Sequence, residues 1–508
     1  MNPMNARSIG LSASLLMALV FQWFFWAEKP GLNLLLFSSL VLGLLLYLHP
    51  ESHRNSRVWV TVVGTLFTGV MVIWHNSGTA KVIHVGATLL AAGYIQRPQL
   101  RSAAYAMGQT IGGYVNLLHT WYLSVQEISQ GRAWLRQGLG YAKLVVIPLV
   151  AVIIFAMLLG AANPKLAEMG SNAVGWLGTW LENWSWGRLG YYGLGLGLVS
   201  ALLLPRAMGA WVGREKDLQD QLRRVRKSHK KSFPLTGLRR EFRTGVLLLI
   251  MVNLLLLANN LVDFNWIWWD FQPEAGFDLT QFVHEGTYYL IISILLAMGI
   301  MLYFFRGNLN YFRNNRLLRT LAYVWISQNA FLTLSVALRN YHYIAESGLA
   351  YKRIGVFFFL SLVLFGLFSL LMKIRDRMSI YYLMRVNGWA VYAAALALCV
   401  VNWDVQITRY NLAHAEKTDS ISSLDREFLL EMTAAALPEL LSHQEVFSQT
   451  QDPRTASYYQ QWLHRDLTRF EEHQANYSWL SWNASDARVK RFLEENPQLI
   501  NSLSDAIE

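Results

Sequence analysis

Polar residues placed along one apolar run of this 508-residue chain have types and spacing that could do chemistry. Asn253 and Asn260 share one face of a helix at 100° per residue, and Asp263 lies within a quadrant of that face. His284 and Glu285 begin the next apolar run. Ionisable groups at membrane depth are costly and often functional, so the five residues predict a polar path or binding site. The alternative interpretation is structural, with the asparagines bonding neighbouring helices and Asp263 lying in the interface.

A second polar cluster surrounds a short loop further along the chain. It comprises Arg339, Tyr343, Glu346, Tyr351 and Arg353. Arginine can bind a carboxylate or a phosphate bidentately, so this cluster could hold an anion or a lipid headgroup. Pairing of its cations with Glu346 and with the acidic loop before it would account for the same residues structurally. Both interpretations are open from the sequence.

Basic residues gather in a third segment, 206–243. Such a loop most often fixes membrane orientation, because Lys and Arg are retained on the cytoplasmic side. It could also bind anionic lipid or a cytosolic partner. The patch that would do so consists of Arg223, Arg224, Arg226, Lys227, Lys230 and Lys231.

Sequence signatures of catalysis are few. The chain contains no HExxH, Walker or GxSxG motif. His49 and His53 flank Glu51, but no third ligand accompanies them, so we predict no metal site. We likewise assign no catalytic residue and no cofactor. These absences lean against an enzyme, although catalysis by carboxylates scattered over loops leaves little linear signature.

The composition predicts that these residues are positioned by membrane helices. Hydrophobic residues make up 54% of the chain and charged residues only 15%, which is more apolar surface than a soluble core needs. The net charge of +11 is concentrated in loops between apolar runs, which favours a lipid bilayer over nucleic acid as the partner. The single cysteine, Cys399, lies in the last run and is expected to be a packed thiol.

Apolar runs long enough to span a bilayer recur along the sequence. The loops between them alternate between basic and acidic or Trp-rich, which places the N-terminus in the cytoplasm and the C-terminus outside. We therefore predict an all-α polytopic helical membrane protein with about eleven spans. The runs cover residues 9–27, 31–48, 57–75, 79–96, 139–160, 188–205, 244–262, 286–305, 318–338, 354–374 and 386–402.

Two segments depart from this simple alternation. Residues 98–138 are interrupted by polar side chains, and treating them as an amphipathic helix at the interface keeps the later loops in phase. Basic residues from Arg339 to Arg353 fall on the outer side, against the rule. The predicted domains are a four-span part (1–97), the interfacial helix (98–138), a seven-span part (139–402) and an extracytoplasmic helical domain (403–508).

Helix signals support the last of these domains. Ser423 and Asp425 precede one apolar-periodic stretch, and Asp452-Pro453 marks the start of a second helix. Ser485-Asp486 is predicted to cap a third helix that stops near Asn496-Pro497. These signals predict three or four helices outside the membrane.

Several short motifs resemble those of a bacterial multispan family. They are Pro30-Gly31-Leu32-Asn33, Asn163-Pro164, the stretch from Tyr343 to Arg353, Asn402-Trp403-Asp404 with Ile407 to Leu412, and Leu424-Asp425 before Ala436-Leu437-Pro438. In this order they resemble the families catalogued as domains of unknown function 4153 and 4173, over most of the chain. The resemblance implies a multi-pass protein of the bacterial cytoplasmic (inner) membrane without an established activity. It supplies no catalytic residues.

Two functional hypotheses follow. The first is a non-enzymatic sensor or scaffold that engages an envelope protein through its C-terminal domain. The second is a permease or lipid-handling protein that uses the polar stripe at Asn253, Asn260 and Asp263, although no internal repeat of the kind common in transporters is visible. The sequence does not fix an oligomeric state.

Overall fold

In a computed structural model the described part of the chain is helical. Among the residues that can be described there is no β-strand, only an isolated bridge between Gln221 and Met378. The predicted all-α class is thus confirmed. The structure describes residues 3–130, 185–204, 209–223, 235–269, 279–305, 308–312, 314–417, 424–449 and 453–505, with a few single residues between 145 and 165.

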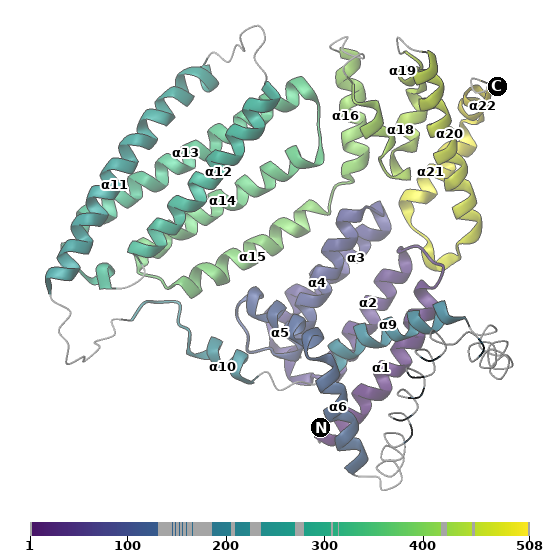
Figure 1. The fold of residues 1–508 in the computed structure, drawn as a ribbon, viewed down its shortest axis with the longest axis horizontal. Coiled ribbons are helices and arrows are strands. Elements are labelled where there is room, and N and C mark those ends of the chain that lie inside the picture. The colour runs from purple at the N-terminus through teal and green to yellow at the C-terminus, as the bar shows by residue number, and fades with distance from the viewer. Residues whose placement is uncertain are drawn as a thin grey trace.

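Helices near the N-terminus form a first group (Figure 1). The helices start and stop where caps and special backbone conformations dictate. Asn55 accepts a hydrogen bond from the Arg57 amide at the start of α3, and Asn76 ends it in the left-handed conformation. Tyr94 and Leu45 lie in the core. The members are α1 (Pro3–Phe25), α2 (Leu32–Leu48), η1 (Pro50–Arg54), α3 (Ser56–His75), α4 (Gly78–Gln96), α5 (Ala103–Val115), α6 (Leu117–Gln130) and α9 (Trp186–Leu203).

The segment predicted as one amphipathic helix, 98–138, forms two helices in its described part. α5 and α6 meet at Asn116, and α5 packs against α4 and α9. Gln109, which marked the segment as polar in sequence, is buried and donates to Gln96 at 3.4 Å. Gln109 therefore serves packing within the first group, whereas Asn116 and His119 are exposed, and the depth of the segment in the membrane stays a prediction.

A second group of helices lies beside the first (Figure 1). Its core contains Trp325, Phe305 and Leu249. The last member, α15, also packs on the first group, where Trp389 stacks on Tyr94 with ring centroids 5.5 Å apart. The members are α11 (Leu235–Asp263), the π-helical turn η2 (Phe264–Trp269), α12 (Leu279–Phe304), η3 (Asn308–Tyr311), α13 (Arg316–Ser347), α14 (Tyr351–Asp376) and α15 (Ile380–Leu398).

Several of these helices can cross a membrane. Four are long and apolar enough by themselves: Ser56–His75, Arg239–Trp269, Arg316–Ser347 and Tyr351–Asp376. A fifth candidate joins Ile380–Leu398 to Trp403–Lys417 across a bend of 61°. Most of the predicted run 139–160 lies outside the described residues, as does most of the Trp-rich loop after it. A described helix overlaps each of the other ten predicted runs. The chain is a helical membrane protein, and the count of eleven spans stays a prediction.

The C-terminal domain is built from short helices around its own core, which includes Phe447 and Leu441. The start at Pro453 and the stop before Pro497 are as predicted. Asp425 caps α17, accepting from the Phe428 amide at 3.0 Å, but Asn483 rather than Ser485 caps α21. The elements are α16 (Trp403–Lys417), α17 (Arg426–Leu430), η5 (Ala434–Ala436), α18 (Leu437–Ser442), α19 (Gln444–Ser448), α20 (Pro453–Asn476), η6 (Trp479–Ser481), α21 (Ala484–Glu495) and α22 (Pro497–Asp505).

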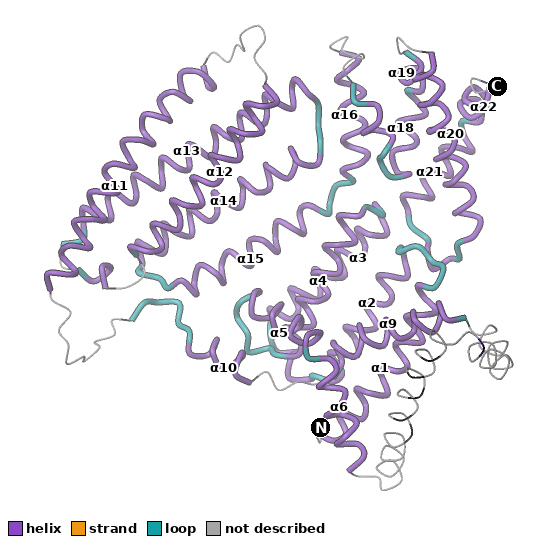
Figure 2. Tube along the Cα trace, in the orientation of Figure 1, coloured by secondary structure: helices purple, strands orange, loops and turns teal. Residues whose placement is uncertain are grey.

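The C-terminal domain lies beyond one end of the membrane helices, which we call the domain end (Figure 2). At the opposite end, which we call the far end, α10 (Gly209–Asp217) and the loop after it run from the first group to the second. Glu215 there accepts hydrogen bonds from the amides of Arg101 and Ser102, and Tyr381 donates to the same carboxylate at 2.7 Å. Arg385 of α15 pairs with Asp220 of the loop.

Candidate functional site

The polar stripe predicted on α11 faces α13. The amide nitrogen of Asn253 donates to the carbonyl of Leu321, and that of Asn260 donates to the carbonyl of Gln328, both at 3.1 Å. Gln328 in turn donates to Asn253 at 2.9 Å. These hydrogen bonds hold two apolar helices together. They matter in a bilayer because the hydrophobic effect contributes little to the association of helices there. The asparagines thus have the interhelical role of the structural interpretation.

Asp263, the acidic end of the stripe, pairs with Arg339 of α13. The Arg339 Nη2 to Asp263 Oδ1 distance is 2.5 Å, and the two side chains are 8% and 2% exposed. Just beyond, Trp268 donates to the Ser335 hydroxyl at 3.0 Å. The polar stripe and the second polar cluster, which are separate in the sequence, are therefore joined by this ion pair. Arg339, the first residue of the stretch that departs from the predicted charge alternation, has its charge neutralised by an acid on the neighbouring helix.

The remaining residues of these clusters are placed less completely. His284 and Glu285 lie in α12, but their side chains are outside the described residues. Of the basic patch, Arg223 is exposed at the end of the described loop. Arg224, Arg226, Lys227, Lys230 and Lys231 lie outside the described residues.

The turn between α13 and α14 is fixed by Arg353. Its guanidinium lies 4.0 Å from the centroid of the Tyr343 ring, a cation–π contact. It donates to the carbonyl of Ser347 at 2.7 Å and to that of Gly348, which are among the unpaired acceptors at the end of α13. Glu346 is exposed. Among the groups proposed as an anion site, Arg339 pairs with Asp263, the first residue of the acidic loop named in the pairing hypothesis, and Arg353 contacts Tyr343 and two backbone carbonyls. No ion pair of either arginine with Glu346 is present among the described residues.

Asn411 of α16 holds this turn against the C-terminal domain. Its side-chain oxygen accepts from the Leu349 amide at 2.6 Å, and its nitrogen donates to the Leu349 carbonyl at 2.9 Å. Gly348 has φ +79°, and a Cβ there would lie 2.5 Å from the Asn411 oxygen. Only glycine adopts this conformation readily, and only glycine leaves room for Asn411. The Asn411 side chain therefore binds both the amide and the carbonyl of Leu349, and so attaches this turn of the membrane helices to the C-terminal domain.

Asp404 makes a second contact at the same place. Its carboxylate is 5% exposed and accepts from the hydroxyls of Tyr351 and Thr433. Tyr351 is the first residue of α14, and Thr433 lies in the C-terminal domain before η5. The buried charge thus connects three segments, and its hydrogen bonds offset part of the cost of burial.

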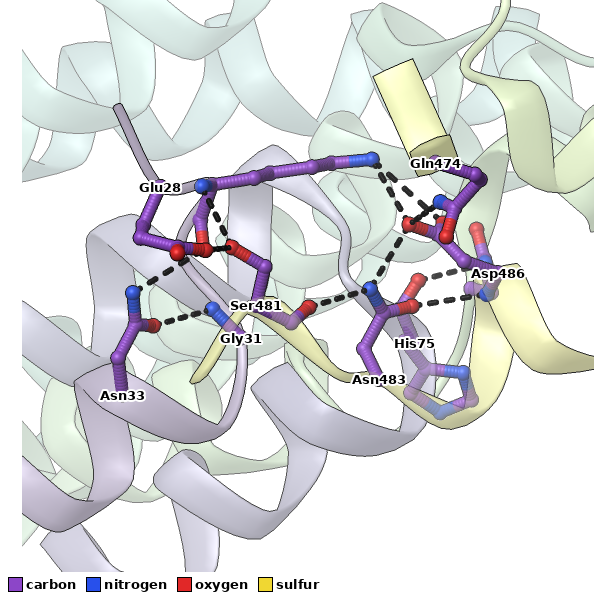
Figure 3. A network of polar contacts seen from close by, with 10 residues as sticks. Glu28, Gly31, Asn33, His75, Gln474, Ser481, Asn483 and Asp486 are labelled. Carbon is purple, nitrogen blue, oxygen red and sulfur yellow. Dashed lines mark hydrogen bonds and ion pairs between the residues drawn. The ribbon is translucent and has the colours of Figure 1, made fainter. Parts of the chain in front are cut away.

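The loop between α1 and α2 makes a separate contact with the C-terminal domain (Figure 3). Lys29 pairs with Asp486 at 3.1 Å, and the Lys29 amide donates to the Ser481 hydroxyl at 2.8 Å. Asp486 also accepts from Gln474 at 2.8 Å. A Cβ on Gly31 would lie 2.6 Å from the Ser481 carbonyl oxygen, so this loop can approach the domain closely only with glycine.

A cleft of about 550 Å³ opens beside the α13–α14 turn. Glu346, Arg353, Asn411, His414 and Asp425 contribute to its wall. Among the described residues no group of three His, Cys, Asp or Glu side chains is arranged to hold a metal ion. The cleft presents two carboxylates, the His414 imidazole and one guanidinium that is already engaged with backbone carbonyls.

A family model for a domain of unknown function, DUF4153, matches residues 36–443. The chain belongs to this family. No curated protein and no solved structure matches it. The matched region of this DUF4153 member includes Tyr351, Asp404 and Asn411, whereas the Lys29–Asp486 contact joins two segments that flank it.

One buried group in this DUF4153 member was not singled out from the sequence. His84 of α4 is 1% exposed and its ring nitrogens lie 3.0 Å from the Thr68 and Ser38 hydroxyls, which come from α3 and α2. Glu215 at the far end was missed as well. A histidine inside an apolar run was the available signal for His84, and no local pattern marks Glu215, because its partners are more than 100 residues away.

Proposed function

We propose that this chain is a non-enzymatic sensor or scaffold of the bacterial cytoplasmic membrane. Its C-terminal domain, outside the membrane, engages an envelope protein, and its membrane helices anchor that domain or respond to it. The N-terminus and the basic loop 206–243 lie in the cytoplasm under this proposal.

The observation that carries the proposal is the attachment of the C-terminal domain to both helix groups. Asn411 and Asp404 bind it to the α13–α14 turn of the second group. Lys29 binds it to the α1–α2 loop of the first group. A domain held at two separated points can transmit a change in its own position to both groups, because packed helices move as rigid elements.

The fate of the polar stripe supports this choice over transport. The side-chain nitrogens of Asn253 and Asn260 are engaged by carbonyls of α13, so they are not available to a passing solute, whereas Asn260 Oδ1 has no partner among the described residues. One observation favours the second candidate, a permease or lipid-handling protein. The other oxygen of Asp263, Oδ2, is buried without a hydrogen-bond partner among the described residues.

Orientation is tested with fused reporters. A reporter that is active only in the periplasm should be active after Glu508 and inactive when inserted near Lys230. The opposite pattern would reverse the orientation and remove the envelope partner from reach of the C-terminal domain.

Function is tested by complementation of a strain that lacks the chain, scored on whichever growth or envelope phenotype follows its loss. A chain that ends before Trp403 should fail to complement, and Asp263→Asn should complement fully at equal membrane abundance. If the truncated chain complements and Asp263→Asn does not, the sensor or scaffold proposal is wrong and the permease is favoured.

A further inference from the structure

A second cleft, of about 510 Å³, lies at the bend between α15 and α16. We call it the elbow cleft. The end of α3, the break after α15, and helices α18 and α21 form its walls. It is separate from both polar clusters of the sequence and from the turn bound by Asn411. The residues that matter for its chemistry are His75, Asn402, Arg409, Glu439, Arg488 and Phe492.

Two guanidinium groups line the elbow cleft. Arg409 directs two nitrogens at one oxygen of Glu439, at 3.0 and 2.5 Å. Arg488 donates to the carbonyls of Ala484 and Trp74 and forms no ion pair with any described residue. Each guanidinium keeps a terminal nitrogen, Nη1, that has no partner within the described part of the chain. Two positive charges against one negative charge leave the cleft attractive to an anion.

Two further lining residues bury acceptors that no described donor satisfies. His75 Nε2 lies 2.7 Å from the Val400 carbonyl, so that nitrogen carries the proton and Nδ1 is left as an acceptor. Asn402 donates to the His75 carbonyl at 3.2 Å, but its own side-chain oxygen is without a donor. Buried polar atoms in native proteins are almost always paired. A ligand with hydroxyl or ammonium donors would complement these atoms, whereas a bare anion would not.

The position of the elbow cleft suits a lipid headgroup. α3 is one of the helices that can span the membrane, and the cleft lies at its last turn. The Arg488 guanidinium lies 5.3 Å from the centroid of the Trp74 ring, which is 53% exposed. Exposed Trp beside Arg at the end of a spanning helix is typical of the interfacial layer where lipid phosphates lie. Val405 and Phe492 add apolar surface to the cleft.

We propose that the elbow cleft binds a phosphate ester that carries hydrogen-bond donors, as the headgroup of an anionic phospholipid does. Arg409 and Arg488 hold the phosphate, and Asn402 and His75 accept from the donors. The site is distinct from the basic patch of loop 206–243. It requires α3 to lie in the membrane but does not depend on the sensor or scaffold proposal.

The test is a titration of the purified full chain in neutral detergent with fluorescent phosphatidylglycerol. Arg488→Gln and Arg409→Gln should each weaken binding about tenfold, because each removes a charge-assisted hydrogen bond to phosphate. Arg491→Gln is the matched control, since Arg491 is exposed on the same helix as Arg488 but does not line the cleft. It should bind as the unchanged chain does. Arg488→Lys, which keeps the charge, should retain more affinity than Arg488→Gln.

Competition separates a lipid from a soluble ligand. If phosphatidylglycerol binds and glycerol 3-phosphate competes only weakly, the site takes lipid; if glycerol 3-phosphate binds as tightly with the same arginine dependence, it takes a soluble phosphate ester. Either result supports the proposal. The proposal would be overturned if Arg491→Gln lost as much affinity as Arg488→Gln. It would also be overturned if neither Arg488→Gln nor Arg409→Gln lost affinity. Binding that disappears only when the basic patch is changed to Gln would also overturn it.

Discussion

Asp263 and Arg339 form a buried ion pair, with the Asp263 Oδ1 and Arg339 Nη2 atoms 2.5 Å apart. The pair joins the end of α11 to the last turns of α13. Arg339 is the first positive charge of a loop that departs from the expected charge alternation, and its partner is the acid that ends the polar stripe. The departure therefore has a structural cause at this residue: the charge is neutralised within the protein.

Breaking this pair from one side should be costly. Arg339→Met leaves the Asp263 carboxylate buried without a partner, which in comparable sites costs about 3–5 kcal/mol of unfolding free energy. The double variant Asp263→Leu with Arg339→Met should lose less than the sum of the single changes, because no isolated charge is left. Unfolding of the detergent-solubilised chain, measured for all four forms of the cycle, checks this. Strictly additive losses would contradict a direct interaction.

Gly348→Ala should loosen the C-terminal domain from the α13–α14 turn. The positive φ of Gly348 and the 2.5 Å approach of its Cβ position to Asn411 both oppose a side chain, and such strain costs about 1–3 kcal/mol. Gly355→Ala in α14 is the control, because a Cβ there meets nothing within 4 Å. The thermal unfolding temperature should fall for Gly348→Ala and should stay the same or rise for Gly355→Ala. Equal effects would mean that close packing at Gly348 is unimportant.

Gly31→Ala tests the contact with the first group. A Cβ would lie 2.6 and 2.8 Å from the carbonyl oxygens of Ser481 and Trp482, which are backbone atoms and cannot rotate away. The loop and the domain must then separate, so limited proteolysis should release the C-terminal domain several times faster than from the unchanged chain. Gly43→Ala in α2, where a Cβ meets nothing within 4 Å, should leave the rate unchanged. Resistance to proteolysis in Gly31→Ala would argue against a close contact.

Asp466 should make stability depend on pH. Burial raises the pKa of this carboxyl above its usual value, despite the opposing charges of Arg465 and Arg469. The charged form is therefore disfavoured in the folded chain at neutral pH, and this unfavourable contribution disappears as the pH falls below the folded pKa. Asp466→Asn should be more stable than the unchanged chain at pH 7, and the difference should shrink toward pH 3. The exposed Glu471→Gln on the same helix corrects for the loss of one charge; a difference that persists in acid would contradict the assignment.

Much of the helical architecture could be predicted from sequence because apolar length and capping are local properties. The helices at Ser56–His75 and Arg316–Ser347 and the start at Pro453 follow from such patterns. The break at Asn116 was not foreseen, since the polar residues around it gave the same amphipathic signal for one helix or two. Gln109 is polar in sequence but buried in the fold, because its partner Gln96 belongs to a neighbouring helix.

The polar contacts were only partly predictable. The helical face shared by Asn253 and Asn260 was evident from their spacing, but not that Leu321 and Gln328 would receive their bonds. Asp263 and Arg339 were assigned to different clusters because nothing local links residues on separate helices. Asn411 could be recognised only as part of a motif, since its role depends on the backbone of Leu349.

The loop after α10 gives the two helix groups a tie at the far end, opposite the one made by the C-terminal domain. There Arg385 pairs with Asp220, and the Ser379 amide donates to the Asp220 carbonyl at 2.7 Å. Simple separation of the groups would break a polar contact at either end. α15 lies between these ties and packs on α4 and α5 of the first group. The two groups are thus joined at both ends and along α15, so a relative movement of either group would have to change contacts in all three places.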